Sequence, residues 1–230
     1  MSFIQAKPPA THDFYGAVHK GLRLALSQLL VRLGAADPAD ADLPGLMAEL
    51  RDQCLLSAGH LAHEDEVIHT ALEARAPGST IRLVQAHDHH RETFNEIAAL
   101  IRQVETAPAA DQARRLRSLY LRFSVFVADD FAHMAEEEQF MLPILQSLFT
   151  DEELREMEDR ITGGLAPEAM IAVARLMIPA ATRTDRLAML GAIRANAPAE
   201  AFAAIIGLAA RPTLSEADFA HLSEGLGLAA

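Results

Sequence analysis

Apolar residues recur every three or four positions along most of the chain, which is the spacing of one face of an α-helix. We find no run in which apolar and polar residues alternate as they do in a half-buried strand. Long helical patterns are joined by short connections and are expected at residues 11–33, 43–75, 79–105 and 111–149. Four long helices with short connections predict an all-α fold, an antiparallel four-helix bundle.

The expected helix ends rest on capping and helix-breaking residues. Thr11 and Ser79 stand where a side chain can cap the first and the third helix. Pro143 lies inside the fourth pattern, where the missing N–H of a proline is expected to kink the last turns. Thr150 and Glu153 have the spacing of a capping box, so a short fifth helix is expected to about residue 161.

The pattern breaks at Gly163-Gly164, so we expect residues 1–162 to form one domain and residues 163–230 a helical C-terminal extension. Prolines separate the shorter helices expected in this extension, which are placed at 167–178, 184–196, 199–210 and 215–226. Its Ala, Leu and Ile positions with few charges suit packing on the bundle or on a second copy, as in a homo-oligomer.

Composition narrows the class of protein. The 230 residues carry a net charge of −12, which disfavours nucleic-acid binding because phosphates require a cationic surface. The single cysteine, Cys54, suits a reducing compartment and is expected in the core. The first ten residues do not resemble a signal peptide, and no apolar stretch approaches the ~20 residues of a membrane span. A cytoplasmic protein without a membrane partner is expected.

Histidines are concentrated in the expected bundle: nine of the ten lie before residue 134. Two His-x-x-x-Glu spacings stand out, His60 with Glu64 and His133 with Glu137. Residues four apart share one face of a helix, so each imidazole and carboxylate can converge on a metal ion. Bundle interiors build dinuclear sites from inward Glu and His side chains on facing helices. The paired spacings therefore predict a metal centre.

Two further histidines lie on apolar faces. His19 is flanked by an apolar stripe, and His87 shares a face with apolar residues four and seven positions away. His90, three residues after His87, could share that face. Solvent exposure is expected for His63, His69, His89 and His221, and a place at the start of a helix for His12.

The fourth helix offers alternative carboxylates. At about 100° per residue, Glu137 returns to the face of His133, whereas Glu138 lies about 140° away. Only a local bulge would favour Glu138. Since Pro143 frees the carbonyl of Gln139 and of neither glutamate, we expect regular geometry and choose Glu137.

The first ~160 residues resemble the hemerythrin-like family, the hemerythrin HHE cation-binding domain. The segments that carry the resemblance are Val18 to Arg23, His60 to Glu73, His87 to His90 and His133 to Pro143. The resemblance implies a four-helix bundle that holds two non-haem iron ions. It also implies that His19, His60, His87 and His133 are terminal ligands and that Glu64 and Glu137 bridge the metals.

The chain departs from the oxygen-carrying members of that family, which have a second histidine four residues after the third-helix one. Arg91 stands at that position here, so His90, His63 or water would complete the site. Those members also place the last carboxylate at the position of Glu138. The departure favours a more open and more reactive iron site over reversible oxygen carriage.

Three functions are compatible with these patterns. The first is a di-iron protein that binds O₂ or a related small oxidant, peroxide or nitric oxide, for sensing, scavenging or storage. The alternatives are a di-iron oxidase or peroxidase, and a regulatory module with the helical extension as its output. Iron is favoured over zinc because the mixed imidazole and carboxylate donors exceed the four ligands typical of zinc.

Overall fold

The computed structural model describes residues 10–228, and all regular structure in that range is helical. The expectation of an all-α fold is therefore confirmed. The helices are α1 Gly16–Ala35, α2 Leu43–His63, η1 Glu64–His69, α3 Thr70–Arg75, α4 Ile81–Thr106, α5 Ala109–Glu136, η2 Glu137–Met141, α6 Leu142–Leu148, α7 Asp151–Gly163, α8 Pro167–Ala180, α9 Arg183–Asn196, α10 Ala199–Ile205, η3 Ile206–Ala210, α11 Arg211–Thr213 and α12 Glu216–Leu226.

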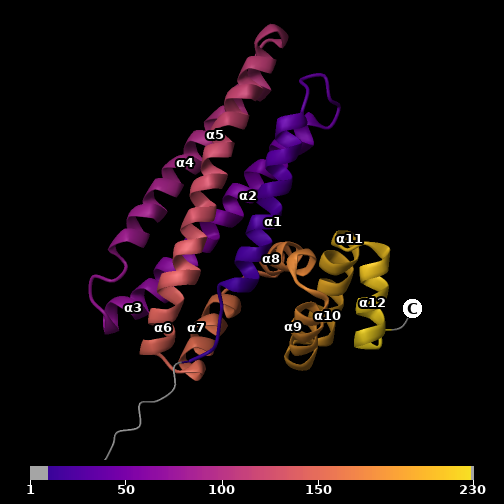
Figure 1. Cartoon of the computed structure of the whole chain (residues 1–230). Coiled ribbons are helices and arrows are strands. Elements are labelled where there is room, and N and C mark those ends of the chain that lie inside the picture. Colours follow the sequence, from indigo (N-terminus) through magenta and orange to yellow (C-terminus); the bar gives the residue numbers. More distant parts are fainter. Residues whose placement is uncertain (1–9, 229–230) are drawn as a thin grey trace, which may run out of the picture.

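The four longest helices lie side by side (Figure 1). Helix α1 packs on α2 and α5, and α4 packs on the same two helices from the other side. Their facing stripes of Leu, Ile, Val and Phe form the largest apolar cluster, and Cys54 lies in it as expected. This cluster fills one end of the four helices, and a second cluster around η1, α6 and α7 fills the other. A group of buried polar side chains lies between the two apolar clusters.

Helix α1 begins later than its expected cap. Thr11 does not cap it, because the helix starts at Gly16. The carboxylate of Asp13 instead accepts hydrogen bonds from the backbone N–H groups of Tyr15 and Gly16, at 3.0 and 2.9 Å. An acidic side chain close to the first turn satisfies free N–H groups and suits the positive end of the helix dipole.

Helix α4 also has a different start from the one expected. It begins at Ile81, and Ser79 does not cap it. The carboxylate of Glu73, at the end of the preceding helix, accepts hydrogen bonds from the backbone N–H groups of Gly78 and Thr80. Capping patterns in a sequence consider only the residue next to the helix start. They therefore miss Glu73, which lies eight residues before Ile81.

The second and the fourth expected helices are each interrupted by a π-helical turn, η1 and η2. These turns begin at Glu64 and Glu137, and the N–H of Leu142 donates to the carbonyl of Glu137, five residues back. The expectation of regular α-helical geometry through Glu138 is wrong. Pro143 follows the π turn at the start of α6, where its missing N–H is tolerated.

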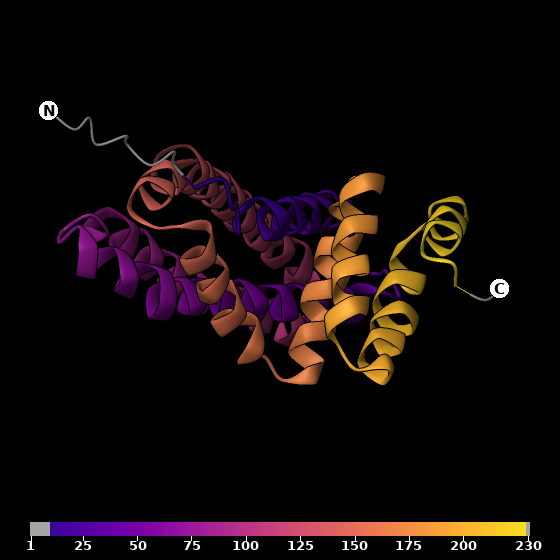
Figure 2. The ribbon, with the colours of Figure 1, turned by 90° about the horizontal axis from the view of Figure 1, so that it is seen from below.

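The C-terminal extension has the helices expected from sequence, and the Thr150–Glu153 capping box of α7 is present. Two details differ. Pro179 lies within α8 and does not end it, and the helix expected at 199–210 is interrupted by the π turn η3 and continues through Pro212 in α11. Figure 2 shows the helices of the extension running across the long helices. Helix α8 packs closely on α1, since a Cβ atom on Gly21 would lie 2.8 Å from the carbonyl oxygen of Leu176.

Within the described range, no single helix is long and apolar enough to cross a membrane. Helices α7 and α8 pass that test only as a pair, by length and composition, and the pair is bent by 119°.

Candidate metal centre

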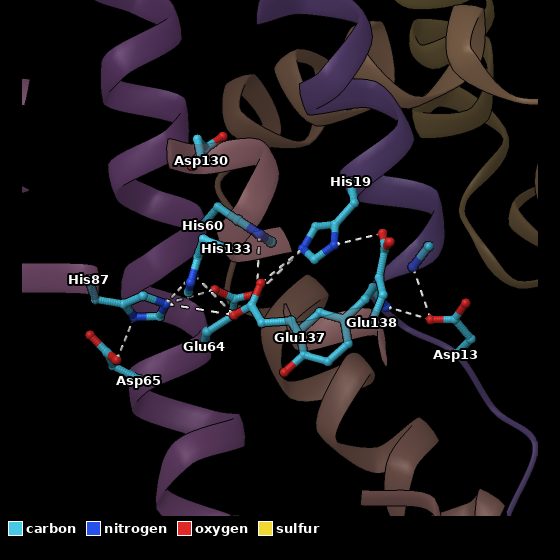
Figure 3. Close-up of polar contacts among 12 residues, drawn as sticks. Asp13, His19, His60, Glu64, Asp65, His87, Asp130, His133, Glu137 and Glu138 are labelled. Carbon is cyan, nitrogen blue, oxygen red and sulfur yellow. Dashed lines mark hydrogen bonds and ion pairs between the residues drawn. The ribbon is translucent and has the colours of Figure 1, made fainter. Parts of the chain in front are cut away.

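The structure brings together all six residues that the sequence predicts as metal ligands (Figure 3). Each long helix contributes one histidine, and the two carboxylates come from the first residues of the π turns. The set is His19 of α1, His60 of α2, Glu64 of η1, His87 of α4, His133 of α5 and Glu137 of η2. Five of the six are buried, and His60 is the most accessible, with 15% of its side chain exposed.

The histidines form two pairs on either side of the carboxylates. On one side, which we call the His19–His60 half, Glu64 Oε1 lies 3.2 Å from His60 Nε2 and 3.8 Å from His19 Nε2. Glu137 Oε2 lies 3.5 Å from the same nitrogen of His19. Two imidazole nitrogens and one oxygen from each carboxylate thus face a common point.

The other side, the His87–His133 half, uses the remaining carboxylate oxygens. Glu64 Oε2 lies 3.6 Å from His87 Nε2, and Glu137 Oε1 lies 3.7 Å from His87 Nε2 and 3.3 Å from His133 Nε2. The two imidazole Nε2 atoms are 3.0 Å apart. Nitrogens bound at right angles to one ion at about 2.1 Å would have nearly the same separation.

The chemistry of this donor set fits metal ions. All four oxygens of Glu64 and Glu137, together with Nε2 of His19 and His60, are buried without a hydrogen-bond partner. Each such atom costs about 1–3 kcal/mol when it is left unsatisfied, so several at one place require an explanation. Bound cations would satisfy these atoms together and neutralise the buried carboxylates, so the residues present fit a metal centre.

The pKa values of the cluster residues are shifted by burial and by the neighbouring charges, and the two effects oppose each other. Burial disfavours the charged form of His19, but Glu138, Glu64 and Glu137 outweigh that effect and raise its pKa to about 9. Burial likewise opposes ionisation of Glu137, yet the nearby imidazoles of His133 and His87 hold its pKa well below the usual range. Burial lowers the pKa of His60 and keeps it neutral. The nearby carboxylates also raise the pKa of His87 against the effect of burial, so without a cation His19 and His87 are the imidazoles favoured to hold a proton.

Glu138 supports the cluster from outside it. Its Oε1 lies 3.0 Å from His19 Nδ1, so His19 presents Nε2 to the carboxylates (Figure 3). Arg23 donates to both oxygens of Glu138, at 2.6 and 2.9 Å, and holds the carboxylate in place. The hydrogen bonds of His19 and Arg23 lower the pKa of Glu138 to about 2 despite some burial. Carboxylates that orient ligating histidines in this way tune metal affinity.

Asp65 plays the same part for His87. Its Oδ1 accepts from His87 Nδ1 at 2.8 Å, and Arg91 and His69 also contact its carboxylate. His69 was expected at the surface, and this expectation is wrong: its ring is buried and stacks on His87 with centroids 4.9 Å apart. The spacing Asp65-x-x-x-His69 is the His-x-x-x-Glu pattern with the carboxylate and the imidazole in reverse order. This spacing was the sequence signal that could have placed His69 on the inner face of its helix.

His90, a candidate fifth histidine ligand, is buried but directed elsewhere. Its Nδ1 lies 3.8 Å from Asp130 Oδ1, and its ring stands edge-on to His133. Burial and the nearby imidazoles lower the pKa of His90 to about 3, and burial raises that of Asp130 to about 6. Among the described residues, neither His90 nor His63 joins a cluster that could hold a metal ion. No sequence pattern pointed to Asp130.

The remaining histidines lie away from the cluster. His12 precedes α1 and lies 3.0 Å from Glu158 of α7, so it connects the start of the chain to α7. His89 and His221 are exposed, as expected from sequence, whereas His63 is half-buried.

Comparison with known proteins agrees with this geometry. The family model described as the hemerythrin HHE cation binding domain matches residues 12–145. Neither the curated proteins nor the solved structures contain a significant match to the chain. The matched range covers more than half of the chain and includes every residue of the cluster. The chain therefore belongs to the hemerythrin HHE cation-binding family.

Proposed function

We propose that the chain holds two iron ions, one in each half of the cluster, bridged by Glu64 and Glu137. The observation that carries this proposal is the division of the carboxylate oxygens. Each glutamate directs one oxygen toward the His19–His60 half and the other toward the His87–His133 half. A single ion would leave one oxygen of each carboxylate buried and unpaired, which costs about 1–3 kcal/mol for each.

The donor types favour iron. Two imidazole nitrogens and two carboxylate oxygens are available to each ion. Four donors would saturate zinc, whereas iron accepts more than four ligands and would keep open positions for a small molecule. Arg91 stands where oxygen-carrying members have a further histidine, and it is bound to Asp65 and Asp88. A pair of iron ions here would supply reversible binding or reduction of a small oxidant.

The protein residues around the cluster suit a small oxygen-containing ligand. Tyr15 stacks on His19 with ring centroids 5.1 Å apart, and its buried hydroxyl has no hydrogen-bond partner. Burial raises its pKa well above the usual value, and Glu137 and Glu64 add to that, so the phenol stays protonated. It can therefore donate a hydrogen bond beside the His19–His60 half. We propose O₂, peroxide or nitric oxide as the ligand, bound for sensing, scavenging or storage.

The fold around the site supports the same interpretation at a finer level. We propose that helices α1, α2, α4 and α5 form the antiparallel four-helix bundle that the family implies, and the packing of α1 and of α4 on both α2 and α5 supports this.

The test is spectroscopic. Iron-loaded protein is prepared and reduced under anaerobic conditions, and separate samples are then exposed to O₂, hydrogen peroxide or nitric oxide. We expect a visible charge-transfer band with at least one of them, and its loss in Tyr15→Phe or a shift in its position. A spectrum unchanged by all three ligands in protein that contains iron would contradict the proposal.

A further inference from the structure

A pocket lies beside the metal centre, between the long helices and helices α7 and α8. Its cavity has a volume of about 590 Å³, within the range of pockets that bind organic ligands. Side chains of α1 and α2 form one wall, and α7 and α8 form the other. At its inner end the pocket reaches His60 and Glu64, and His60 is the most accessible of the six cluster residues. The pocket is far larger than a diatomic oxidant needs.

The walls of the pocket are apolar. Leucine, isoleucine, valine, methionine and alanine side chains from both walls line it, among them Leu56, Ile161, Val173 and Met177. Such walls bind the body of an apolar molecule by removing its surface from water. Since α8 supplies part of one wall, the extension completes the pocket.

A glycine in α2 leaves room in this pocket. Gly59 lines it and precedes His60, and a glycine inside a helix costs about 1 kcal/mol relative to alanine. A Cβ atom built on Gly59 would meet nothing within 4 Å, so close packing does not require the glycine. The space it leaves belongs to the pocket, next to a ligand of the proposed metal centre.

The charges on the pocket select the ligand. Among the described residues that line it there is no lysine or arginine, whereas Glu49, Asp52 and the partly exposed Glu158 lie at its edge. Glu49 is paired with Arg32 and Glu158 with His12, and no ion pair of Asp52 is found in the described range. The half-buried His60 and His63 also line the pocket, but at its edge a carboxylate or phosphate ligand would be repelled by the acidic side chains, whereas an ammonium group would be attracted to them.

We propose that this pocket binds a small hydrophobic amine. Its apolar body lies between α2, α7 and α8, and its ammonium group lies at the acidic edge formed by Glu49, Asp52 and Glu158. The site goes beyond the proposed binding of a small oxidant and does not depend on which metal the cluster holds. It places an organic molecule directly against the accessible side of the metal centre.

Three indoles of one body and different charge test the proposal: tryptamine, tryptophol and indole-3-propionate. The chain contains no tryptophan, so indole fluorescence reports the ligand alone. Calorimetry and fluorescence of the full-length, metal-loaded protein should show that tryptamine binds at least tenfold more tightly than indole-3-propionate, with tryptophol between them. Equal binding of all three, or tighter binding of the carboxylate, would overturn the assignment of an amine.

A matched pair of glycine variants locates the binding site. Gly59→Leu fills the pocket, and Gly191→Leu in α9 is the control, because a Cβ at either position meets nothing within 4 Å. We expect Gly59→Leu to weaken tryptamine binding at least tenfold and Gly191→Leu to bind like the parent. Tryptamine binding unchanged in Gly59→Leu would overturn the pocket.

Metal content measured on the same samples separates this proposal from the metal centre. Gly59→Leu is expected to keep the metal content of the parent while it loses the amine. Asp52→Asn should reduce the preference for tryptamine over tryptophol, and an unchanged preference would contradict the role of the acidic edge.

Discussion

At the scale of single residues, the site depends on how two glutamates are placed. Glu64 and Glu137 are buried, and each directs its two oxygens to opposite halves of the cluster. Glu138 is adjacent in sequence to Glu137 but faces His19 Nδ1 and Arg23. Neighbouring carboxylates therefore have different roles: Glu137 faces the centre, and Glu138 orients one of the imidazoles.

This division predicts different effects of two substitutions. Glu137→Ala should lower the number of metal ions bound at saturation, because each half loses an oxygen. Glu138→Ala should keep that number but weaken the affinity by about tenfold or more, as is typical when a group that orients a ligating histidine is removed. Metal titration followed by elemental analysis distinguishes the two. A lower stoichiometry in Glu138→Ala alone would contradict the assignment.

The raised pKa of His19 predicts how metal uptake depends on pH. Burial opposes its charge, but Glu138, Glu64 and Glu137 raise the pKa to about 9, so the metal-free fold holds a proton on His19 at neutral pH. This proton stabilises the metal-free fold fully below about pH 6.5, and the stabilisation is lost as the pH rises through about 9.

A metal ion must displace that proton, because only neutral imidazole ligates. The apparent affinity of metal-free protein for Zn²⁺, used as a redox-inactive probe, should therefore rise by up to about tenfold per pH unit between about pH 7 and pH 9. His19→Ala should show a weaker dependence over that interval. An affinity of the parent that is independent of pH there would show that His19 does not bind the metal.

The residues of the cluster were predictable from sequence because they follow local rules. The His-x-x-x-Glu spacings lie within one helix, and the apolar faces around His19 and His87 predict that they point inward. Asp65 with Arg91, His69 with His87, and His90 with Asp130 are contacts that depend largely on how helices are rotated against each other. The spacing of residues within one helix does not show how that helix is rotated against its neighbours.

At the scale of elements, both glutamates stand at the start of a π-helical turn. Such turns add a residue to a helix and occur often at functional sites. One extra residue shifts the apolar pattern of a helix only slightly. The apolar pattern therefore predicts continuous helices over 43–75 and 111–149. Pro143 was a partial signal, since the π turn ends just before it. Element types and most boundaries, by contrast, follow from the apolar pattern and the prolines.

The packing of α8 on α1 leads to a prediction about stability. Gly21→Ala places a Cβ 2.8 Å from the Leu176 carbonyl oxygen, which is backbone and cannot turn away. We expect a loss of about 1–3 kcal/mol in the free energy of unfolding. Gly59→Ala is the matched control, where a Cβ meets nothing within 4 Å, and a gain of about 0.5–1 kcal/mol is expected.

Thermal unfolding of both variants checks this prediction. Gly21→Ala should melt below the parent and Gly59→Ala above it. Equal melting temperatures of parent and Gly21→Ala would show that α8 does not pack on α1 in solution as it does here.

At the scale of the whole molecule, the extension is part of the surroundings of the metal centre. Leu176 of α8 packs with Leu22 of α1 and Met134 of α5, close to two of the cluster histidines. Helices α7 and α8 also close the pocket that reaches His60. The break at Gly163-Gly164 marks a change of direction between α7 and α8, yet both helices contribute to one pocket. The apolar pattern predicts the helices of the extension but not the surface on which they pack.

Whether the cluster holds a pair of iron ions is decided by the ratio of iron to protein. This ratio is measured by elemental analysis on anaerobically purified parent and on the His60→Ala, His133→Ala double variant, with helical content checked by circular dichroism. We expect about two iron ions per chain in the parent and essentially none in the variant, with helical content largely kept. One zinc ion per chain in the parent, or two metal ions retained by the variant, would contradict a di-iron centre built on these residues.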